Sequence, residues 1–293
     1  PQTRGRPVMT THARPAGRPH VTLGIGAVAV RASRRAVITV TLLLVAVAVT
    51  AVLAVGLGKY PVAPMDVLSV LTGSNTSFDR VVVLEWRLPR MLMALLVGAA
   101  LGLSGAIFQA VTGNPLGSPE IVGVNFGAYT GALAVLVTLG SGYYAVAVGA
   151  LIGGLATAVL VYALSFQRGV AGYRLIVVGI AVGAVLNSVN QWIVIKLDHH
   201  TAVTAAVWQQ GTLSGLSWSQ VVPMTVCVEL LVSALTALGP QLPVLQLGDD
   251  AAGALGLRPD RARVAYLVVG VGLVAVACAA AGPITFIALA APP

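Results

Sequence analysis

Residues 36–58 read AVITVTLLLVAVAVTAVLAVGLG, which is 23 consecutive positions without a charged side chain. At a rise of about 1.5 Å per residue, a helix of this length measures roughly 34 Å. That length is enough to cross a hydrocarbon core of about 30 Å. The apolar region of a cleaved signal peptide is shorter, about 7–15 residues. We therefore predict an uncleaved membrane-spanning helix.

Comparable apolar runs follow along the rest of the chain. We predict further spans over 91–111, 121–139, 143–165, 173–195, 219–238 and 264–280, and an eighth apolar run begins near Ile284. The composition agrees, because only 9% of the residues are charged, whereas soluble domains carry about 25%. The predicted fold class is an all-α polytopic membrane protein, and this class excludes soluble enzymes, secreted domains and disordered proteins.

Small residues indicate that the predicted helices pack closely. The chain has 33 glycines and only 5% aromatic residues, a balance that favours a helical bundle over a β-barrel with aromatic girdles. Several glycine pairs have the GxxxG spacing of close helix contacts, namely Gly98/Gly102, Gly127/Gly131, Gly149/Gly153 and Gly179/Gly183.

The first 35 residues contain seven arginines and no acidic residue. Such a segment buries too little apolar surface to order itself, so we predict that residues 1–35 form a disordered tail. Lys and Arg in alternate loops number twelve on the side of the N-terminus and five on the other. The positive-inside rule therefore predicts a cytoplasmic N-terminus. We attribute the net charge of +8 to this topology and to contact with membrane lipid. We predict no nucleic-acid partner.

The sequence lacks the motifs of catalysis and of metal or nucleotide binding. No G-x-x-x-x-G-K-[ST] occurs, and Cys227 and Cys278 lie in apolar runs. Asp198, His199 and His200 are adjacent, so they cannot all face one ion on regular structure and belong to an exposed loop. We predict no catalytic residue, cofactor or metal site.

Polar residues within the predicted spans are candidates for a transport pathway, because such side chains face the bundle or a water-filled space. Gln109 lies at the inner end of the second span, and Asn187 and Asn190 lie in the fifth with Ser188 and Gln191. Hydrogen bonding between helices is an equal alternative for the cluster in the fifth span. The role of Glu229, in the sixth span, stays open.

Two arginines stand at the outer end of the second span. Arg87 and Arg90, in the segment Arg87-Leu88-Pro89-Arg90, oppose the positive-inside bias. Snorkelling to lipid headgroups is one explanation, and docking of an acidic partner is the other, which we favour. At the inner end, residues 114–119 (NPLGSP) contain two prolines and must reverse the chain tightly.

Several segments of this chain resemble, in the same order, the motifs of permease subunits of ABC importers for iron–siderophores, haem and vitamin B12. The family patterns are RxPR, NPLAxPxxLG, WxxGSLxG, LxLG[ED]xAxxLG and GPIGFxGL. The matching segments are RLPR (87–90), NPLGSPEIVG (114–123), WQQGTLSG (208–215), LQLGDDAAGALG (245–256) and GPITFIAL (282–289).

This resemblance implies a subunit of about ten membrane helices that pairs with a second permease around one pathway. Cytoplasmic ABC ATPase subunits would hydrolyse ATP for it, and an extracytoplasmic substrate-binding protein would deliver the cargo. The chain would then be a transport subunit of the bacterial cytoplasmic membrane and not itself an enzyme. The expected cargo is an iron–siderophore, with vitamin B12 or haem as alternatives, and either a homodimer or a heterodimer is compatible with the sequence.

The resemblance also implies roles for individual residues. Arg87 and Arg90 would dock the binding protein, Asn114 and Leu116 would form a cytoplasmic gate, and a second gate falls near Gly172 and Tyr173. Within a cytoplasmic loop at about 239–263, residues 242–257 match two short helices that contact the ATPase; an amphipathic interfacial helix is the alternative. The coupling residues implied are Leu245, Leu247, Gly248, Asp249, Asp250, Ala251, Leu255 and Gly256.

The chain departs from the family pattern at a few positions. Gly117 replaces an alanine, and Thr285 and Ala288 replace glycines. Pro293 stands where the family has a histidine and then about two more spans. With seven complete spans and part of an eighth, we expect the natural protein to continue for roughly 40–60 residues past Pro293.

Two other classes of function compete with an ATP-driven permease. A self-sufficient secondary transporter would couple to ions through intramembrane acids, and only Glu229 is plainly embedded in a predicted span. A membrane-embedded enzyme would need a catalytic set, and none is found. Uptake driven by ATP and not by an ion gradient would distinguish an ATP-driven permease from a secondary transporter.

Overall fold

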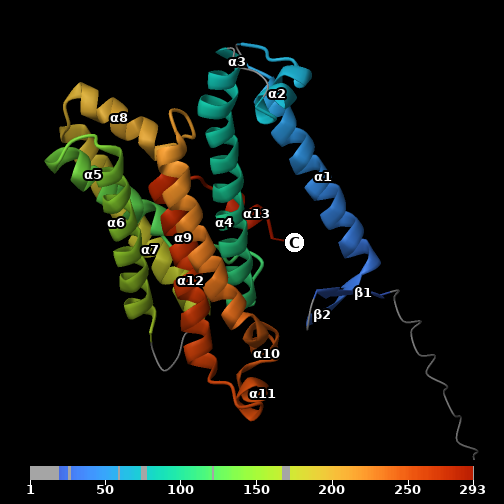
Figure 1. Ribbon diagram of the computed structural model, residues 1–293. Helices are drawn as coiled ribbons and strands as arrows, with labels where there is room; N and C mark the ends of the chain where they lie inside the picture. The colour runs from blue at the N-terminus through green and yellow to red at the C-terminus, as the bar shows by residue number, and fades with distance from the viewer. Residues whose placement is uncertain are drawn as a thin grey trace, which may run out of the picture. The chain divides into compact units, whose positions relative to one another are not determined.

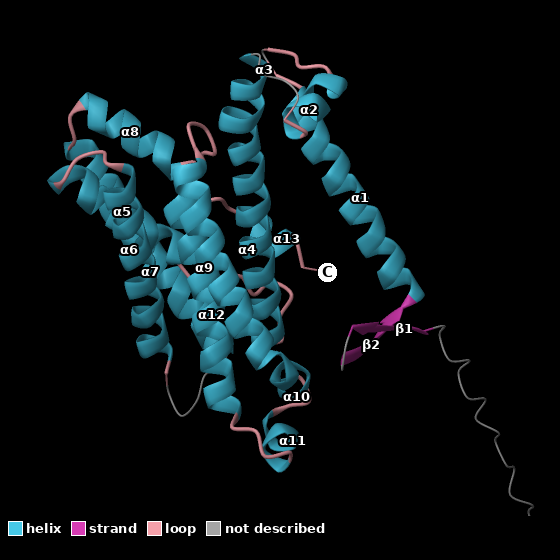
Figure 2. Ribbon diagram, viewed as in Figure 1, coloured by secondary structure: helices cyan, strands magenta, loops and turns pink. Residues whose placement is uncertain are grey.

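The computed structural model describes residues 20–25, 28–58, 60–73, 78–120, 122–166 and 172–292. The described chain forms two units, one ending at Val62 and the other beginning at Ala63. The first unit contains an antiparallel hairpin of β1 (His20–Ile25) and β2 (Val28–Ser33), paired from His20 with Ser33 to Ile25 with Val28. Figure 2 shows the strands of the described chain confined to this hairpin.

The hairpin lies within residues 1–35, for which the disordered tail as a whole stays a prediction. The stretch between His20 and Ser33 is rich in Val, Ile and Leu, residues that favour strands, and the arginine count of the whole tail concealed this local composition. Residues 1–19, which carry four of the seven arginines, lie outside the described residues. The hairpin leads into α1 (Arg34–Gly56), a 23-residue helix that has no charged side chain after Arg35.

The second unit is a bundle of helices (Figure 1). Its elements are α2 (Pro64–Leu71), α3 (Phe78–Val81), η1 (Val82–Arg87), α4 (Leu88–Thr112), α5 (Val124–Thr138), α6 (Tyr143–Ser165), α7 (Gly172–Lys196), α8 (His199–Gln209), α9 (Trp218–Leu238), η2 (Gly239–Gln241), α10 (Leu242–Leu245), α11 (Asp249–Ala254), α12 (Pro259–Ala281) and α13 (Ile287–Ala290).

Helix α12 forms the centre of this bundle and contacts α4, α5, α6 and α9. The largest fully buried side chains come mainly from α4 and α12, and include Phe108, Met93, Tyr266 and Leu273. Helix α8 and the beginning of α4 lie at one end of the bundle, and α10 and α11 lie at the opposite end (Figure 1). The predicted docking residues, at the beginning of α4, and the predicted coupling residues, in α10 and α11, therefore lie at opposite ends of the bundle.

Among the described residues, six helices are long and apolar enough to cross a membrane. They are Arg34–Gly56, Phe78–Thr112, Tyr143–Ser165, Tyr173–Lys196, Trp218–Leu238 and Pro259–Ala281. The second begins well before the predicted residue 91. Pro89 lacks the N–H that an α-helix needs, but η1 is π-helical and closes with a bond from Leu88 N–H to the carbonyl of Val83, a wider turn that lets the helix continue.

The span predicted over residues 121–139 is the short helix α5 instead. Its 15 residues measure about 22 Å, less than a hydrocarbon core of about 30 Å. The preceding residues cannot extend it, because Pro115 and Pro119 interrupt the helix and Gly123 has a left-handed φ of 82°. Within the described residues, the eighth apolar run begins with a non-helical stretch and continues as the one-turn helix α13.

Two of the glycine pairs account for the contact between α5 and α6. A Cβ atom on Gly131 would lie 2.0 Å from the carbonyl oxygen of Gly149, and one on Gly153 would lie 2.3 Å from that of Gly127. The two backbones therefore touch directly, as small-residue interfaces in membranes allow. The pair Gly98/Gly102 is different, since a Cβ on Gly98 would meet no atom within 4 Å.

Candidate functional site

The predicted docking arginines lie at the end of the bundle where α4 begins. Arg87 ends η1 and is partly buried, and Arg90 lies in the first turn of α4 with an exposed side chain. The structure places both at the end opposite α10 and α11 (Figure 1).

The predicted gate is a tight turn that follows α4. Asn114 Oδ1 accepts a hydrogen bond from the Leu116 N–H at 2.9 Å, and the Asn114 carbonyl accepts one from the Gly117 N–H at 2.9 Å. Leu116 is 63% exposed at the tip of the turn. The side chain of Asn114 therefore shapes the turn, and the apolar side chain of Leu116 projects from it.

Gly117 has a structural reason for replacing the alanine of the family pattern. A Cβ atom there would lie 2.4 Å from Thr112 Oγ1 and 3.1 Å from the Asn114 carbonyl oxygen. The Thr112 hydroxyl is itself held by a 2.6 Å hydrogen bond to the Phe108 carbonyl. The side chain at position 112 thus occupies the space that an alanine methyl group would need.

The residues predicted for the second gate begin α7. Gly172 is the first residue of this helix, and the side chain of Tyr173 is 77% exposed. Residues 167–171, which precede them, lie outside the described residues.

The predicted coupling segment forms two short helices, α10 and α11. Gly248 separates them with a φ of 95°, a left-handed value that favours glycine. Asp249 accepts two hydrogen bonds from the Arg263 guanidinium, at 2.9 and 2.5 Å, so α11 is tied to α12. Leu245 faces inward, whereas the other coupling side chains are exposed; these are Leu247, Asp250, Ala251 and Leu255, and Gly256 ends the segment with a φ of 82°.

The three pathway candidates differ in their surroundings. The amide of Asn190 is fully buried, accepts a hydrogen bond from Thr130 at 2.8 Å and donates one to the Phe126 carbonyl at 3.1 Å. These contacts join α7 to α5 and support the alternative of interhelical hydrogen bonding. Gln109 donates to the Leu289 carbonyl at 3.1 Å. Asn187 is partly buried on α7, and its assignment to the pathway stays a proposal.

The structure brings together three segments that lie far apart in the sequence. Glu120 Oε2 accepts a hydrogen bond from the Phe286 N–H at 2.8 Å, and Asn125 Oδ1 accepts one from the Cys278 thiol at 3.2 Å. The Thr212 N–H donates to the Ala281 carbonyl at 2.7 Å. The motif blocks around residues 120, 210 and 284 therefore meet in the bundle. The sequence did not predict this contact.

Glu120 is the residue at this junction that sequence reasoning missed. An acidic residue between two apolar runs, directly after Pro119, was the available signal. We call residues 282–290 the return segment, because the chain leaves the end of α12 and lies against α4 again at Gly105 (Figure 1).

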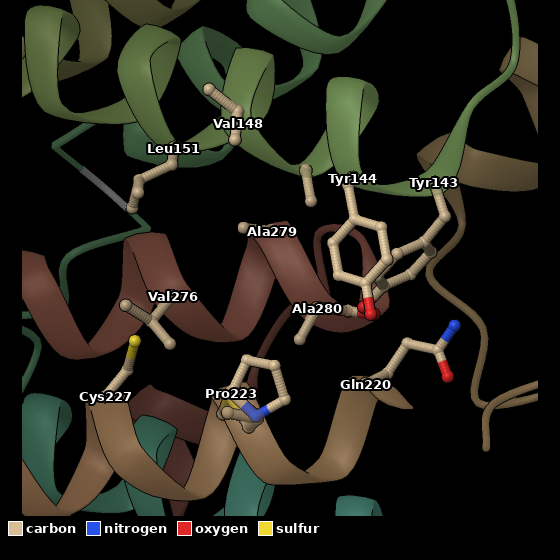
Figure 3. Close-up of a pocket in the computed structure, with 12 residues that line it drawn as sticks. Tyr143, Tyr144, Val148, Leu151, Gln220, Pro223, Cys227, Val276, Ala279 and Ala280 are labelled. Atoms are coloured by element: carbon tan, nitrogen blue, oxygen red, sulfur yellow. The ribbon is translucent and has the colours of Figure 1, made fainter. Parts of the chain in front are cut away.

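An apolar hollow of about 150 Å³ lies between α6, α9 and α12 (Figure 3). Tyr143 and Tyr144 stand at one side of it, and their hydroxyls donate to the carbonyls of Ala280 and Ser219. Gln220 accepts a hydrogen bond from the Ser217 N–H at the start of α9. These polar side chains form hydrogen bonds with backbone groups. The hollow therefore has an apolar surface and no set of side chains suited to catalysis.

Outside the spans, Asp198 caps the N-terminus of α8. Its carboxylate accepts a hydrogen bond from the Thr201 N–H at 3.0 Å, which holds the pKa of Asp198 below its usual value. His199 and His200 follow it as the first exposed residues of α8. Within the described part of the chain, no group of three or more His, Cys, Asp or Glu side chains is placed to hold a metal ion.

Comparison with known proteins assigns this architecture to a family. A profile of the FecCD transport family matches residues 42–293, which is most of the chain. The chain belongs to the FecCD transport family. It is thus a membrane-spanning transport permease, and the resemblance found in the motifs is confirmed.

The chain is similar to several FecCD relatives. It is 43% identical over 260 residues to the ferric enterobactin transport system permease protein FepG of Escherichia coli, covering 89% of this chain and 79% of the relative. It is 36% identical to the iron(3+)-hydroxamate import system permease protein FhuG of Bacillus subtilis, covering 87% and 78%. The cobalamin import system permease protein BtuC of Halobacterium salinarum is 33% identical, with 73% and 58% covered.

A solved structure shares the fold of this FecCD chain. It is a metal-chelate type ABC transporter in an inward-facing conformation, which superposes with a TM-score of 0.75 at 27% sequence identity. The match covers 87% of this chain and 79% of that one. The helical architecture of the second unit is therefore that of a permease in this family.

Proposed function

We propose that this chain is the permease subunit of an ABC importer that carries an iron–siderophore across the bacterial cytoplasmic membrane. The observation that carries the proposal is the pair of short helices α10 and α11, with exposed Leu247 and Leu255, at the end of the bundle opposite Arg87 and Arg90. An importer of this kind needs one surface for an ATPase and another for a delivery protein. The similarity to FepG, a ferric enterobactin transport permease, and to FhuG, an iron(3+)-hydroxamate import permease, supports the choice of cargo.

The ATPase surface of this proposal consists of α10, α11 and the turn at Gly248. The bidentate contact between Asp249 and Arg263 holds α11 in place, so the exposed side chains of Leu247, Asp250 and Leu255 form a preformed surface. A partner ATPase would bury these two leucines. The N-terminus and the α10–α11 end would then be cytoplasmic, in agreement with the arginine count.

The delivery surface consists of Arg87 and Arg90. Their guanidinium groups suit carboxylates on a substrate-binding protein, since Arg pairs with carboxylates through two parallel hydrogen bonds. A second permease copy or a homologous permease would complete the pathway, with the exposed Leu116 of each turn at the cytoplasmic gate. In this proposal, Tyr173 also belongs to the gate and Asn187 belongs to the pathway.

Uptake by membrane vesicles tests the proposal directly. Vesicles containing the natural protein, its ATPase and its binding protein should accumulate iron-55 presented as a ferric siderophore only when ATP is inside. Accumulation driven by a proton or sodium gradient without ATP would favour a secondary transporter. Uptake of labelled cobalamin or haem, with no uptake of ferric siderophore, would reassign the cargo within the same importer class.

Two variants test the two surfaces separately. Gly248→Val should abolish co-purification of the ATPase, because a β-branched residue strongly disfavours a φ of 95°. Gly239→Ala is the matched control, since Gly239 lies outside α10 and α11 with a right-handed φ of −45°, and a methyl group added there would meet no atom within 4 Å. ATPase binding that survives Gly248→Val would show that the surface is misassigned.

For the delivery surface, the double change Arg87→Glu and Arg90→Glu should abolish stimulation of the ATPase by loaded binding protein. Arg80→Glu, at an exposed position of α3 in the same region, should leave that stimulation unchanged. Removal of one member of an interfacial ion pair costs about 2–5 kcal/mol when the pair is buried. Normal stimulation of the double variant would contradict the assignment.

A further inference from the structure

The return segment, residues 282–290, is an irregular stretch of backbone that is buried at Gly282, Pro283 and Ala288 and exposed at Thr285 and Phe286. Gly282 turns the chain with a φ of 77°. Phe286 has a φ of 69°, and within the described residues it is the one non-glycine residue with a positive φ. Only Ile287–Ala290 is helical. Because hydrocarbon offers no hydrogen bonds, irregular backbone at membrane depth must find polar partners in the protein.

Three residues that are distant in the sequence contact the return segment, two of them through hydrogen bonds. The Phe286 N–H donates to Glu120 Oε2 at 2.8 Å. Gln109 donates to the Leu289 carbonyl at 3.1 Å. On α4, Gly105 admits the backbone of Ala288 so closely that a Cβ atom would lie 1.7 Å from its carbonyl oxygen.

The Glu120 contact is the one that joins two irregular segments to each other. Glu120 lies in the stretch between α4 and α5, six positions after Asn114, and it meets the stretch between α12 and α13. Gln109 and Gly105, by contrast, belong to the regular helix α4. One irregular stretch precedes α5 and the other precedes α13, and a single carboxylate bonds one to the other.

The surroundings of this contact are polar but incompletely paired. Within the described residues, the buried side-chain nitrogen and oxygen atoms without a hydrogen-bond partner are Glu120 Oε1, Asn125 Nδ2 and Tyr129 OH. All three belong to residues 120–129. The thiol of Cys278 is fully buried beside them and donates to Asn125 Oδ1 at 3.2 Å. Because these three atoms lack hydrogen-bond partners, no complete hydrogen-bond network would hold this region in place if the Glu120 contact were removed.

We propose that Glu120 is a positioning residue of transport, which holds the return segment against the α4–α5 connection so that the two move together. This inference rests on the proposed function for its transport consequence. The carboxylate accepts from the Phe286 N–H, and bonds to a charged acceptor are stronger than neutral ones. The α4–α5 connection also contains Asn114 and Leu116, so a displacement at the proposed gate reaches the return segment through Glu120.

The reactivity of Cys278 reports the position of the return segment, because this thiol is shielded where α12 leads into it. The experiment uses the natural protein in membrane vesicles with Cys227→Ala, so that Cys278 is the thiol followed in this part of the chain, and N-ethylmaleimide as the probe. Modification at Cys278 is quantified by mass spectrometry. We expect the unchanged Glu120 protein to react slowly.

Glu120→Ala should raise the rate of modification of Cys278 about tenfold or more, since loss of a charged hydrogen-bond acceptor weakens the closed arrangement by a factor of that order. Glu120→Gln keeps the shape and one acceptor oxygen and should give an intermediate rate. Glu85→Gln, at an exposed carboxylate in η1, is the matched control and should leave the rate unchanged. Protection of Cys278 in both Glu120 variants would overturn the proposal.

A transport measurement separates positioning from general stability. In the same vesicles, Glu120→Gln should lower the maximal rate of ATP-driven uptake severalfold and leave the concentration of binding protein for half-maximal uptake unchanged. A Glu120→Gln protein with increased Cys278 labelling and normal uptake would refute the role in transport. If the unchanged protein takes up no ferric siderophore, the proposed function fails, whereas the labelling result still decides whether Glu120 holds the return segment.

Discussion

The contact between α5 and α6 makes a quantitative prediction about two glycines that look alike in the sequence. Gly131→Ala would place a Cβ atom 2.0 Å from the Gly149 carbonyl oxygen, whereas Cβ atoms are essentially never found within 3.0 Å of another heavy atom. The obstacle is backbone, so no side-chain rotation can relieve it. The helices must move apart by about 1 Å, which also opens the neighbouring contact of Gly153 with Gly127.

Overpacking of this kind costs about 1–3 kcal/mol. Gly98→Ala is the matched change, because Gly98 lies in α4 with no atom within 4 Å of the new methyl group. Alanine is favoured over glycine in a helix interior by about 1 kcal/mol. The two substitutions are chemically identical, yet we expect Gly131→Ala to destabilise the protein and Gly98→Ala to leave it unchanged or stabilise it.

Unfolding in mixed micelles of increasing sodium dodecyl sulfate content, followed by tryptophan fluorescence, measures both variants against the unchanged protein. Equal stability of the two variants, or a Gly131→Ala protein as stable as the original, would refute the close approach of α5 and α6. Gly149→Ala supplies a second test from the other helix, since its Cβ would lie 2.7 Å from the Gly131 carbonyl oxygen.

Three further predictions concern the connections between helices. Gly117→Ala should lower stability by about 1–3 kcal/mol, and Thr112→Ala in the same chain should recover part of the loss, a coupling that a double-mutant cycle measures. Arg263→Ala should reduce ATPase co-purification and change bundle stability by only about 0–1 kcal/mol, as expected for a partly exposed ion pair; an unchanged ATPase yield would contradict this. Because the Thr201 N–H lowers the pKa of Asp198, the capping contribution of this carboxylate is complete above its unfolded pKa and is lost as the pH falls through the lower folded value. Hydrogen exchange at the first amides of α8 should therefore accelerate in acid below about pH 4, and Asp198→Asn, which caps without titrating, should remove this dependence.

The sequence by itself determined the class of protein and much of its plan. Long apolar runs without charge require a membrane whatever their neighbours are, so α1, α6, α7, α9 and α12 were predicted close to their observed bounds. The motif blocks sufficed to place the chain in the FecCD transport family. The turn at Asn114 and the two short helices around Gly248 also follow from local signals, because proline, glycine and a capping side chain act on their own neighbourhood.

Only the tertiary structure decided where irregular backbone replaces a span. The apolar runs around residues 121–139 and after Ile284 have the composition of membrane helices, and their hydropathy does not reveal that each begins with a non-helical stretch. Those stretches are stable because Glu120, Gln109 and Gly105 meet the backbone of residues 286–289 from more than 160 positions away. Tertiary packing likewise distinguished Gly131 from Gly98 and gave Asn190 its partners on α5. Such contacts depend on which helix faces come together, whereas hydropathy and spacing report only the properties of each segment alone.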